Sequence, residues 1–193
     1  FMVRVASLKD MVNADYKKLD IAGMTAKEQL TAVTKAVHDF ADMQYSTYNR
    51  ALVPQLEQNG LVIVRDHADL TEEEGRYADR YFNEFVYPVL TPMAVDSSRP
   101  FPLIRNKTLN IGALVAKKGE KDTEIEFATV QVPSVLPRVV RIPAAKEGDT
   151  EVAVLLLEEI IERNSSRLLL NYNVLCAHPF RITRNADLAI DED

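Results

Sequence analysis

Residues 108–132 read TLNIGALVAKKGEKDTEIEFATVQV, and this stretch decides the fold of the second half of the chain. Apolar side chains alternate in its first part with the period of a strand that has one buried face. They are Leu109, Ile111, Ala113 and Val115. A polar run over residues 117–122 separates this part from a second alternating segment over residues 125–132. Two alternating segments joined by a short polar loop predict an antiparallel hairpin.

The residues that follow the hairpin extend the same kind of structure. Residues 138–142 and 172–183 are rich in apolar and β-branched side chains and predict a third and a fourth strand. Between them, residues 152–161 are apolar with interspersed glutamates and predict mostly helix.

The first half of the chain has a helical period instead. Thr25 and Glu28 have the spacing of a capping box, in which each side chain bonds the other residue's backbone N–H. Apolar residues then recur every three or four positions, at Leu30, Val33, Val37, Phe40 and Tyr48. Thr71 and Glu74 repeat the capping pattern before a second helix. The first five residues, FMVRV, are apolar and predict a strand-like or buried segment.

Four prolines between residues 88 and 102 separate the two halves. The expected fold class is therefore α+β: a helical N-terminal domain followed by a mixed, mainly antiparallel sheet domain with helices. We expect residues 1–96 to be part of the first domain and residues 97–193 to be part of the second.

Composition excludes several classes of protein. The chain has 193 residues, of which 47% are hydrophobic and 27% charged, and this is ordinary globular composition. The single cysteine, Cys176, cannot form an internal disulfide, which suits a reducing compartment. The net charge of −6 argues against a general nucleic-acid binder. No apolar run approaches the roughly 20 residues of a membrane span. Both ends break off within a pattern, so we expect a fragment of a larger protein.

Charge is unevenly distributed along this acidic chain. Residues 97–118 carry five basic side chains and no acidic one, and residues 127–146 carry three more without an acid. One interpretation is an anion site, because clustered Arg and Lys attract polyanions and Arg binds phosphate oxygens with two N–H groups. The other interpretation is a solvated sheet edge that charge protects from pairing. Composition alone favours the second interpretation, a solvated sheet edge.

The sequence shows no catalytic constellation. His38, His67 and His178 have no metal-ligating companion at useful spacing, so each is interpreted as a surface or structural histidine. Cys176 has apolar neighbours, which predicts a buried and unreactive thiol. The glycines are isolated, and no phosphate-binding glycine loop is present.

Five segments, in this order along the chain, resemble the polyphosphate kinase family, of the type that works through a phosphohistidine. They are FMVRVA at 1–6, YF with PVLTPMAVD at 81–96, RPFP with its following asparagines at 99–110, VP with LPR at 132–138, and FRITRNADL at 180–188.

The resemblance implies an enzyme that reversibly transfers the terminal phosphate of ATP to inorganic polyphosphate and uses Mg²⁺. It implies a helical N-terminal domain, a head domain and two catalytic domains, of which this chain matches parts of the first two. The phosphorylated histidine and the metal ligands of the family belong to the catalytic domains. We therefore expect no catalytic or metal-binding residue here, no tightly bound cofactor and no activity of this portion alone.

The same resemblance implies polyphosphate as a partner, ATP and ADP for the parent enzyme, and a homo-oligomer. It implies a cytoplasmic location and leaves membrane association within a complex open. The expected polyphosphate-binding residues are Arg105, Lys107, Arg138, Arg181 and Arg184. For Arg181 and Arg184 the alternative is pairing with Asp187 or Asp191.

Three roles stay open at this point. The portion guides substrate, or it is an assembly module that makes the oligomer and touches no substrate. The least favoured role is a free-standing binder of anions or phosphoinositides.

Overall fold

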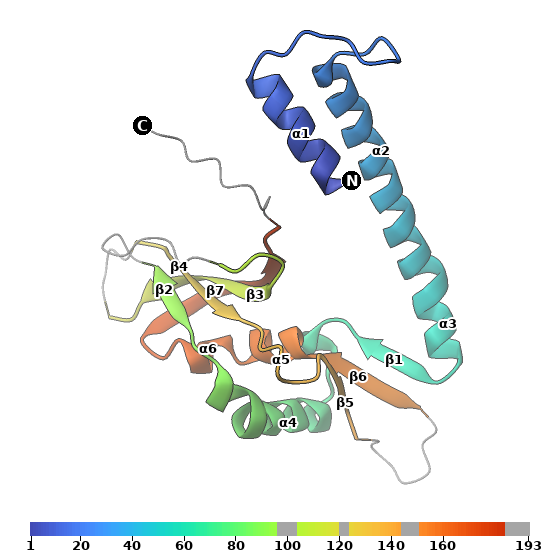
Figure 1. Ribbon diagram of the computed structural model, residues 1–193. Coiled ribbons are helices and arrows are strands. Elements are labelled where there is room, and N and C mark those ends of the chain that lie inside the picture. Colours follow the sequence, from blue (N-terminus) through green and yellow to red (C-terminus); the bar gives the residue numbers. More distant parts are fainter. Residues whose placement is uncertain (96–103, 120–123, 144–150, 184–193) are drawn as a thin grey trace. The chain divides into compact units, whose positions relative to one another are not determined.

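The computed structural model describes residues 1–95, 104–119, 124–143 and 151–183 (Figure 1). Within them the chain forms two compact units, one over residues 1–55 and the other over residues 56–183. None of the helices in the described ranges combines the length and apolar character that a bilayer crossing requires.

The first unit is helical. It contains α1 (Met2–Asn13) and α2 (Ala26–Thr47), and α2 continues through a π-helical turn, Tyr48–Leu52, into α3 (Val53–Gln58). The capping box before α2 is confirmed: the Thr25 hydroxyl accepts from the Glu28 N–H at 3.3 Å, and the Glu28 carboxylate accepts from the Thr25 N–H at 2.8 Å. Both N–H groups would otherwise lack a partner at the helix start.

The strand-like interpretation of the first five residues is wrong, because they begin α1. Val5 is half-buried and Leu8 fully buried, with the three-residue spacing of a helix face. A five-residue apolar run is too short to separate a strand from a buried helix.

The second unit contains a mixed three-stranded sheet, in the order β1 (Leu61–Val64), β6 (Val152–Leu156) and β5 (Val139–Arg141). β1 and β6 are parallel, and β5 and β6 are antiparallel. The helical interpretation of residues 152–161 is right only for their second part, where α5 (Leu157–Arg163) begins. The first five residues become strand because they pair with β1 and β5, two distant segments whose pairing the local pattern does not encode.

The second sheet is antiparallel and four-stranded. Its order is β2 (Met93–Val95), β4 (Glu126–Gln131), β3 (Leu109–Lys117) and β7 (Tyr172–Arg181). The predicted hairpin is confirmed as β3 and β4, with Asn110 opposite Gln131 and Val115 opposite Glu126. Together with the three-stranded sheet and the helices, it confirms the predicted α+β class and the mixed, mainly antiparallel sheet architecture.

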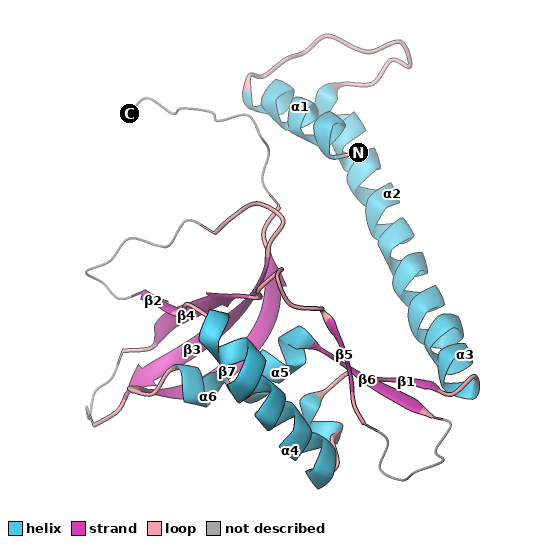
Figure 2. Ribbon diagram, turned by 60° about the horizontal axis from the view of Figure 1, so that its bottom comes forward, coloured by secondary structure: helices cyan, strands magenta, loops and turns pink. Residues whose placement is uncertain are grey.

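Helices cover one face of the four-stranded sheet (Figure 2). They are α4 (Glu72–Tyr81), which continues through a π-helical turn (Phe82–Val86) and a 3₁₀ turn (Tyr87–Val89), then α5 and α6 (Ser165–Leu168). A further 3₁₀ turn, His67–Asp69, precedes α4.

The core lies between these helices and the sheet. Ile111, Ala113 and Val115 of β3 are buried, as the alternation predicts, whereas Leu114 between them is exposed. They belong to one cluster with Phe82 and with the apolar side of α5.

Candidate anion-binding surface

Three of the predicted basic residues lie at one end of the β3–β7 strand pair. Arg181 ends β7 and stands opposite Leu109, the first residue of β3. Arg105 and Lys107 belong to the turn that leads into β3, and the Lys107 N–H donates to the Ile182 carbonyl at 2.8 Å. The antiparallel register therefore brings together side chains that are 74 to 76 positions apart in the sequence.

The turn that carries Arg105 and Lys107 has a defined backbone. The Thr108 hydroxyl donates to the Arg105 carbonyl at 2.8 Å. Lys107 has φ of +63°, the left-handed region that costs free energy for residues other than glycine. In this conformation the Lys107 N–H donates to the Ile182 carbonyl. Lys107, one of the predicted anion-binding residues, therefore has a strained backbone.

The three side chains are exposed, and within the described part of the chain no carboxylate lies within 4 Å of the charged group of Arg105, Lys107 or Arg181. Three positive charges at one sheet end raise the local concentration of anions. We name Arg105, Lys107 and Arg181 the cationic end of the sheet.

Arg138 lies elsewhere, just before β5 in the other sheet. Its Nε donates to both carboxylate oxygens of Glu158, at 3.0 and 3.2 Å, and its Nη2 also donates to Glu158. The Glu158 side chain is only 5% exposed, so Arg138 neutralises a buried charge on α5. Glu158 follows Arg138 by 20 positions, and the local charge count therefore missed the pair. Arg184, with Asp187 and Asp191, lies outside the described residues.

A second charged cluster surrounds α5, and it brings together two histidines that the sequence treats as isolated. The Nδ1 atom of His67 lies 3.5 Å from Glu159 Oε2 and 3.9 Å from Asp66 Oδ1. The His178 Nδ1 lies 3.3 Å from Glu162 Oε1. Burial, and next the charge of Glu159, raise the pKa of Glu162, although both histidines act in the opposite direction.

The sequence contains a partial signal for this second cluster. Glu159 and Glu162 are three positions apart on a helix, which places them on one face. Their histidine partners come from β7 and from a turn that lies 92 residues before Glu159, and only the fold shows that proximity.

An ion pair also joins α4 to α5. Arg163 Nε donates to Asp79 Oδ1 at 2.9 Å, and Arg167 lies 3.9 Å from the same carboxylate. Burial alone would raise the pKa of Asp79, but the hydrogen bond and charge of Arg163, with Arg167 and Asn164, hold it below its ordinary value.

Mg²⁺ favours a near-octahedral set of oxygen ligands, usually shared with substrate phosphates. The group of three possible ligands found among the described residues, Asp66, His67 and Glu159, includes an imidazole. This donor set does not fit a Mg²⁺–nucleotide site, and no phosphoryl-transfer step is assigned to it.

The fold and this surface define a class of protein: a helical unit joined to an α+β unit that presents a cationic sheet end. Sequence models of two known domains match the chain, the polyphosphate kinase N-terminal domain over residues 1–64 and the polyphosphate kinase middle domain over residues 73–193. The chain therefore belongs to the polyphosphate kinase family.

Individual relatives agree with the family. The chain is 44% identical over its full length to the polyphosphate kinase of Lactiplantibacillus plantarum and 41% identical to that of Halalkalibacterium halodurans. It resembles the crystal structure of polyphosphate kinase from Porphyromonas gingivalis with a TM-score of 0.80 and 26% identity over 98% of its residues. It spans only 26–27% of the length of these three proteins.

Proposed function

We propose that the chain forms the N-terminal and head part of a polyphosphate kinase that reversibly transfers the terminal phosphate of ATP to inorganic polyphosphate. ATP, ADP and Mg²⁺ would then serve the parent enzyme, in the cytoplasm and as a homo-oligomer. The matches to the N-terminal and middle domains support this assignment. In this proposal the chain guides polyphosphate and contributes no reacting group.

The observation that carries the guiding role is the cationic end of the sheet. Phosphoryl transfer depends mainly on positioning and on charge stabilisation, and a polyanion needs an electropositive path to the reacting centre. Arg105, Lys107 and Arg181 supply three exposed charges without a carboxylate partner among the described residues. Arg138 is already engaged by a buried carboxylate, so we place the weight of the proposal on the other three.

Calorimetric titration of the 193-residue chain with long-chain polyphosphate tests the role. The triple variant Arg105→Gln, Lys107→Asn, Arg181→Gln removes the charges, and asparagine keeps the left-handed backbone of position 107 accessible. We expect its affinity to fall at least about tenfold, or about 1.4 kcal/mol. Binding by the unchanged chain should weaken as salt screens the charges.

A matched control removes three charges elsewhere: Lys17→Gln, Lys35→Gln and Arg76→Gln. These cations are exposed and already pair with Asp15, Asp39 and Glu72. The control should bind polyphosphate almost as tightly as the unchanged chain. Equal losses of affinity in both triple variants would contradict the guiding role, because the net charge of the chain would then explain the binding.

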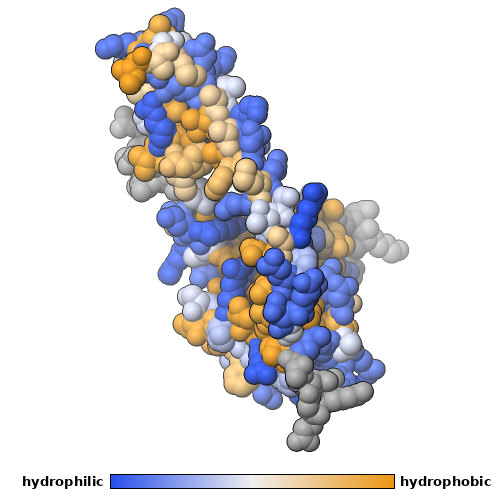
Figure 3. Space-filling view, turned by 90° about the vertical axis from the view of Figure 1, so that its right-hand side faces the viewer, coloured by the Kyte–Doolittle hydropathy of each residue, from blue (hydrophilic) through white to orange (hydrophobic). Residues whose placement is uncertain are grey.

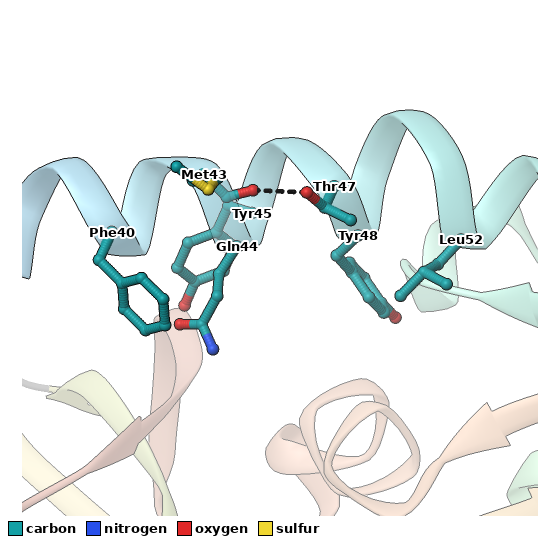
Figure 4. Close-up of a pocket in the computed structure, with 7 residues that line it drawn as sticks. All are labelled: Phe40, Met43, Gln44, Tyr45, Thr47, Tyr48 and Leu52. Carbon is teal, nitrogen blue, oxygen red and sulfur yellow. Dashed lines mark hydrogen bonds between the residues drawn. The ribbon is translucent and has the colours of Figure 1, made fainter.

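The assembly role is the second candidate, and an apolar stripe along the end of α2 and the π-helical turn after it favours it. Phe40, Gln44, Tyr48 and Leu52 project from one side of the helix (Figure 4), and Phe40, Tyr48 and Leu52 are 60%, 40% and 50% exposed. The face drawn in Figure 3 shows apolar residues interspersed with polar ones. Sedimentation equilibrium separates the roles, because a concentration-dependent dimer without polyphosphate affinity supports assembly. Substitution of Phe40 and Leu52 by serine should then abolish that dimer.

A further inference from the structure

The cluster at the start of α5 has the geometry of a metal site, which lies outside the function proposed above. Asp66 caps the 3₁₀ turn that begins at His67 and precedes α4, and Glu159 lies in the first turn of α5. Each contributes one ligand atom, and these atoms all lie within 4.8 Å of one another. Three groups from two distant segments therefore converge on one point.

The two separations from the His67 nitrogen are close to those of ligands on a shared ion. Two ligands at 2.0–2.1 Å from a tetrahedral metal are separated by about 3.4 Å. His67 Nδ1 lies 3.5 Å from Glu159 Oε2 and 3.9 Å from Asp66 Oδ1. Both distances exceed the mode for a hydrogen bond, and small side-chain movements would bring them to the separation of ligands on one ion.

The His67 imidazole supplies an independent observation. Its Nδ1 atom is buried and makes no hydrogen bond within the described structure. The facing oxygen of Glu159 instead accepts from the His67 backbone N–H at 3.3 Å. Such orphaned atoms are rare in folded proteins and call for a missing partner, commonly a water or an ion. The atom lies within 4 Å of two carboxylates, where a cation fits better than a neutral partner.

We propose that Asp66, His67 and Glu159 bind a divalent transition-metal ion, with Zn²⁺ as the best match. One imidazole and two carboxylates suit Zn²⁺ better than Mg²⁺ or Ca²⁺, which favour oxygen ligands alone. Three protein ligands leave a fourth position for water or an external ligand. The ion would join the turn before α4 to α5 and thereby stabilise the helical layer beneath the sheet.

Titration of the chelator-treated chain with Zn²⁺, in the presence of excess Mg²⁺, tests the proposal. We expect one equivalent to bind, and the variants His67→Gln and Glu159→Gln to lose at least tenfold in affinity. Co²⁺ as a probe should give the intense visible absorption of tetrahedral coordination in the unchanged chain and lose it in His67→Gln. The control His38→Gln removes an exposed histidine on α2 and should leave both readouts unchanged.

Thermal unfolding with and without Zn²⁺ keeps the test informative if a variant folds poorly. Zn²⁺ should raise the unfolding temperature of the unchanged chain and of His38→Gln, but not of His67→Gln. The proposal is overturned if Zn²⁺ binds no better than Mg²⁺, or if His67→Gln retains the affinity. It is also overturned if His67→Gln lowers the unfolding temperature equally with and without Zn²⁺, because a plain ion pair of His67 with Glu159 then accounts for the cluster.

Discussion

At the scale of single residues, buried charge decides which basic side chains serve the fold. Arg138 shares its run of the sequence with other bases, yet its guanidinium is held by Glu158. A carboxylate in so buried a position costs free energy unless a cation neutralises it. Arg138 thus serves the stability of the fold, because its partner Glu158 lies on α5.

We expect Arg138→Gln to lower the free energy of unfolding by about 2–3 kcal/mol, because it leaves a buried carboxylate without its cation. The loss is below the full range for buried pairs since the Arg138 side chain is 63% exposed. Urea denaturation of the single variant and of Arg138→Gln with Glu158→Gln measures this. The double variant should recover much of the loss, and an Arg138→Gln chain of unchanged stability would contradict the assignment.

Asp79 should make stability depend on pH on the acid side. Its pKa is lower in the folded chain than in the unfolded chain, so the folded state binds the proton less readily. The stabilisation is complete above the ordinary pKa of an aspartate, about 3.9, and is lost as the pH falls through the folded pKa. Denaturant unfolding should show Asp79→Asn as less stable at pH 7, and the difference should shrink towards low pH. A difference that is constant with pH would refute the ionic explanation.

At the scale of elements, the contact of α4 with α5 depends on a glycine. A Cβ atom on Gly75 would lie 2.7 Å from Arg163 Nη2, too close for a real contact. The guanidinium would have to move, although its bonds to Asp79 hold it in place. Because Gly75 has no side chain, the Arg163 guanidinium can lie against α4 and bind Asp79.

The effect of Gly75→Ala on the free energy of unfolding should consequently have opposite signs with and without Arg163. In the unchanged chain we expect a loss of about 1 kcal/mol, because displacement of Arg163 outweighs the better helix propensity of alanine. In an Arg163→Gln background the same substitution should stabilise the chain by up to about 1 kcal/mol, since only the propensity gain remains. Chemical denaturation of the four chains completes the double-mutant cycle, and equal effects in both backgrounds would contradict the contact.

The elements themselves were largely predictable. The capping box at Thr25, the alternation through β3 and the strand β7 are short-range patterns, and all three are confirmed. The two errors among the elements, at the first five residues and at β6, concern short apolar runs that fit either structure. Partners outside the run decide such cases, because helix and strand propensities differ by less than tertiary packing contributes. The predicted burial of Cys176 is also wrong, because its side chain is exposed on β7.

At the scale of the whole molecule, the two units differ in the size of their apolar cores. In the described residues of the helical unit only Leu8, Ala26 and Val53 are buried apolar residues, whereas the second unit has a large cluster from β3, β4, β6, α5 and the turn after α4. Opening of local structure requires less free energy where fewer apolar contacts are lost. We therefore expect the two units to differ in stability.

Native-state hydrogen exchange should show this difference. Amides in the middle of α2 should exchange at least about tenfold faster than those in the centre of β3 and β4, a difference of at least about 1.4 kcal/mol in opening free energy. Thr25→Ala should accelerate exchange in α2, where the cap is lost, and leave β3 unaffected. Exchange at one common rate in both units would show a single cooperative structure and contradict this expectation.

The sequence by itself determined the family resemblance, the α+β class, most elements and the basic character of the second half. These properties reside in local periodicity and in ordered short motifs, which are read without knowledge of distant partners. Only the tertiary structure decided that Arg105 and Lys107 join Arg181, that Arg138 serves Glu158, and that His67 lies against Glu159. The physical reason is that charge interactions depend on distance and burial, and both are set when strands and helices far apart in the chain pack together.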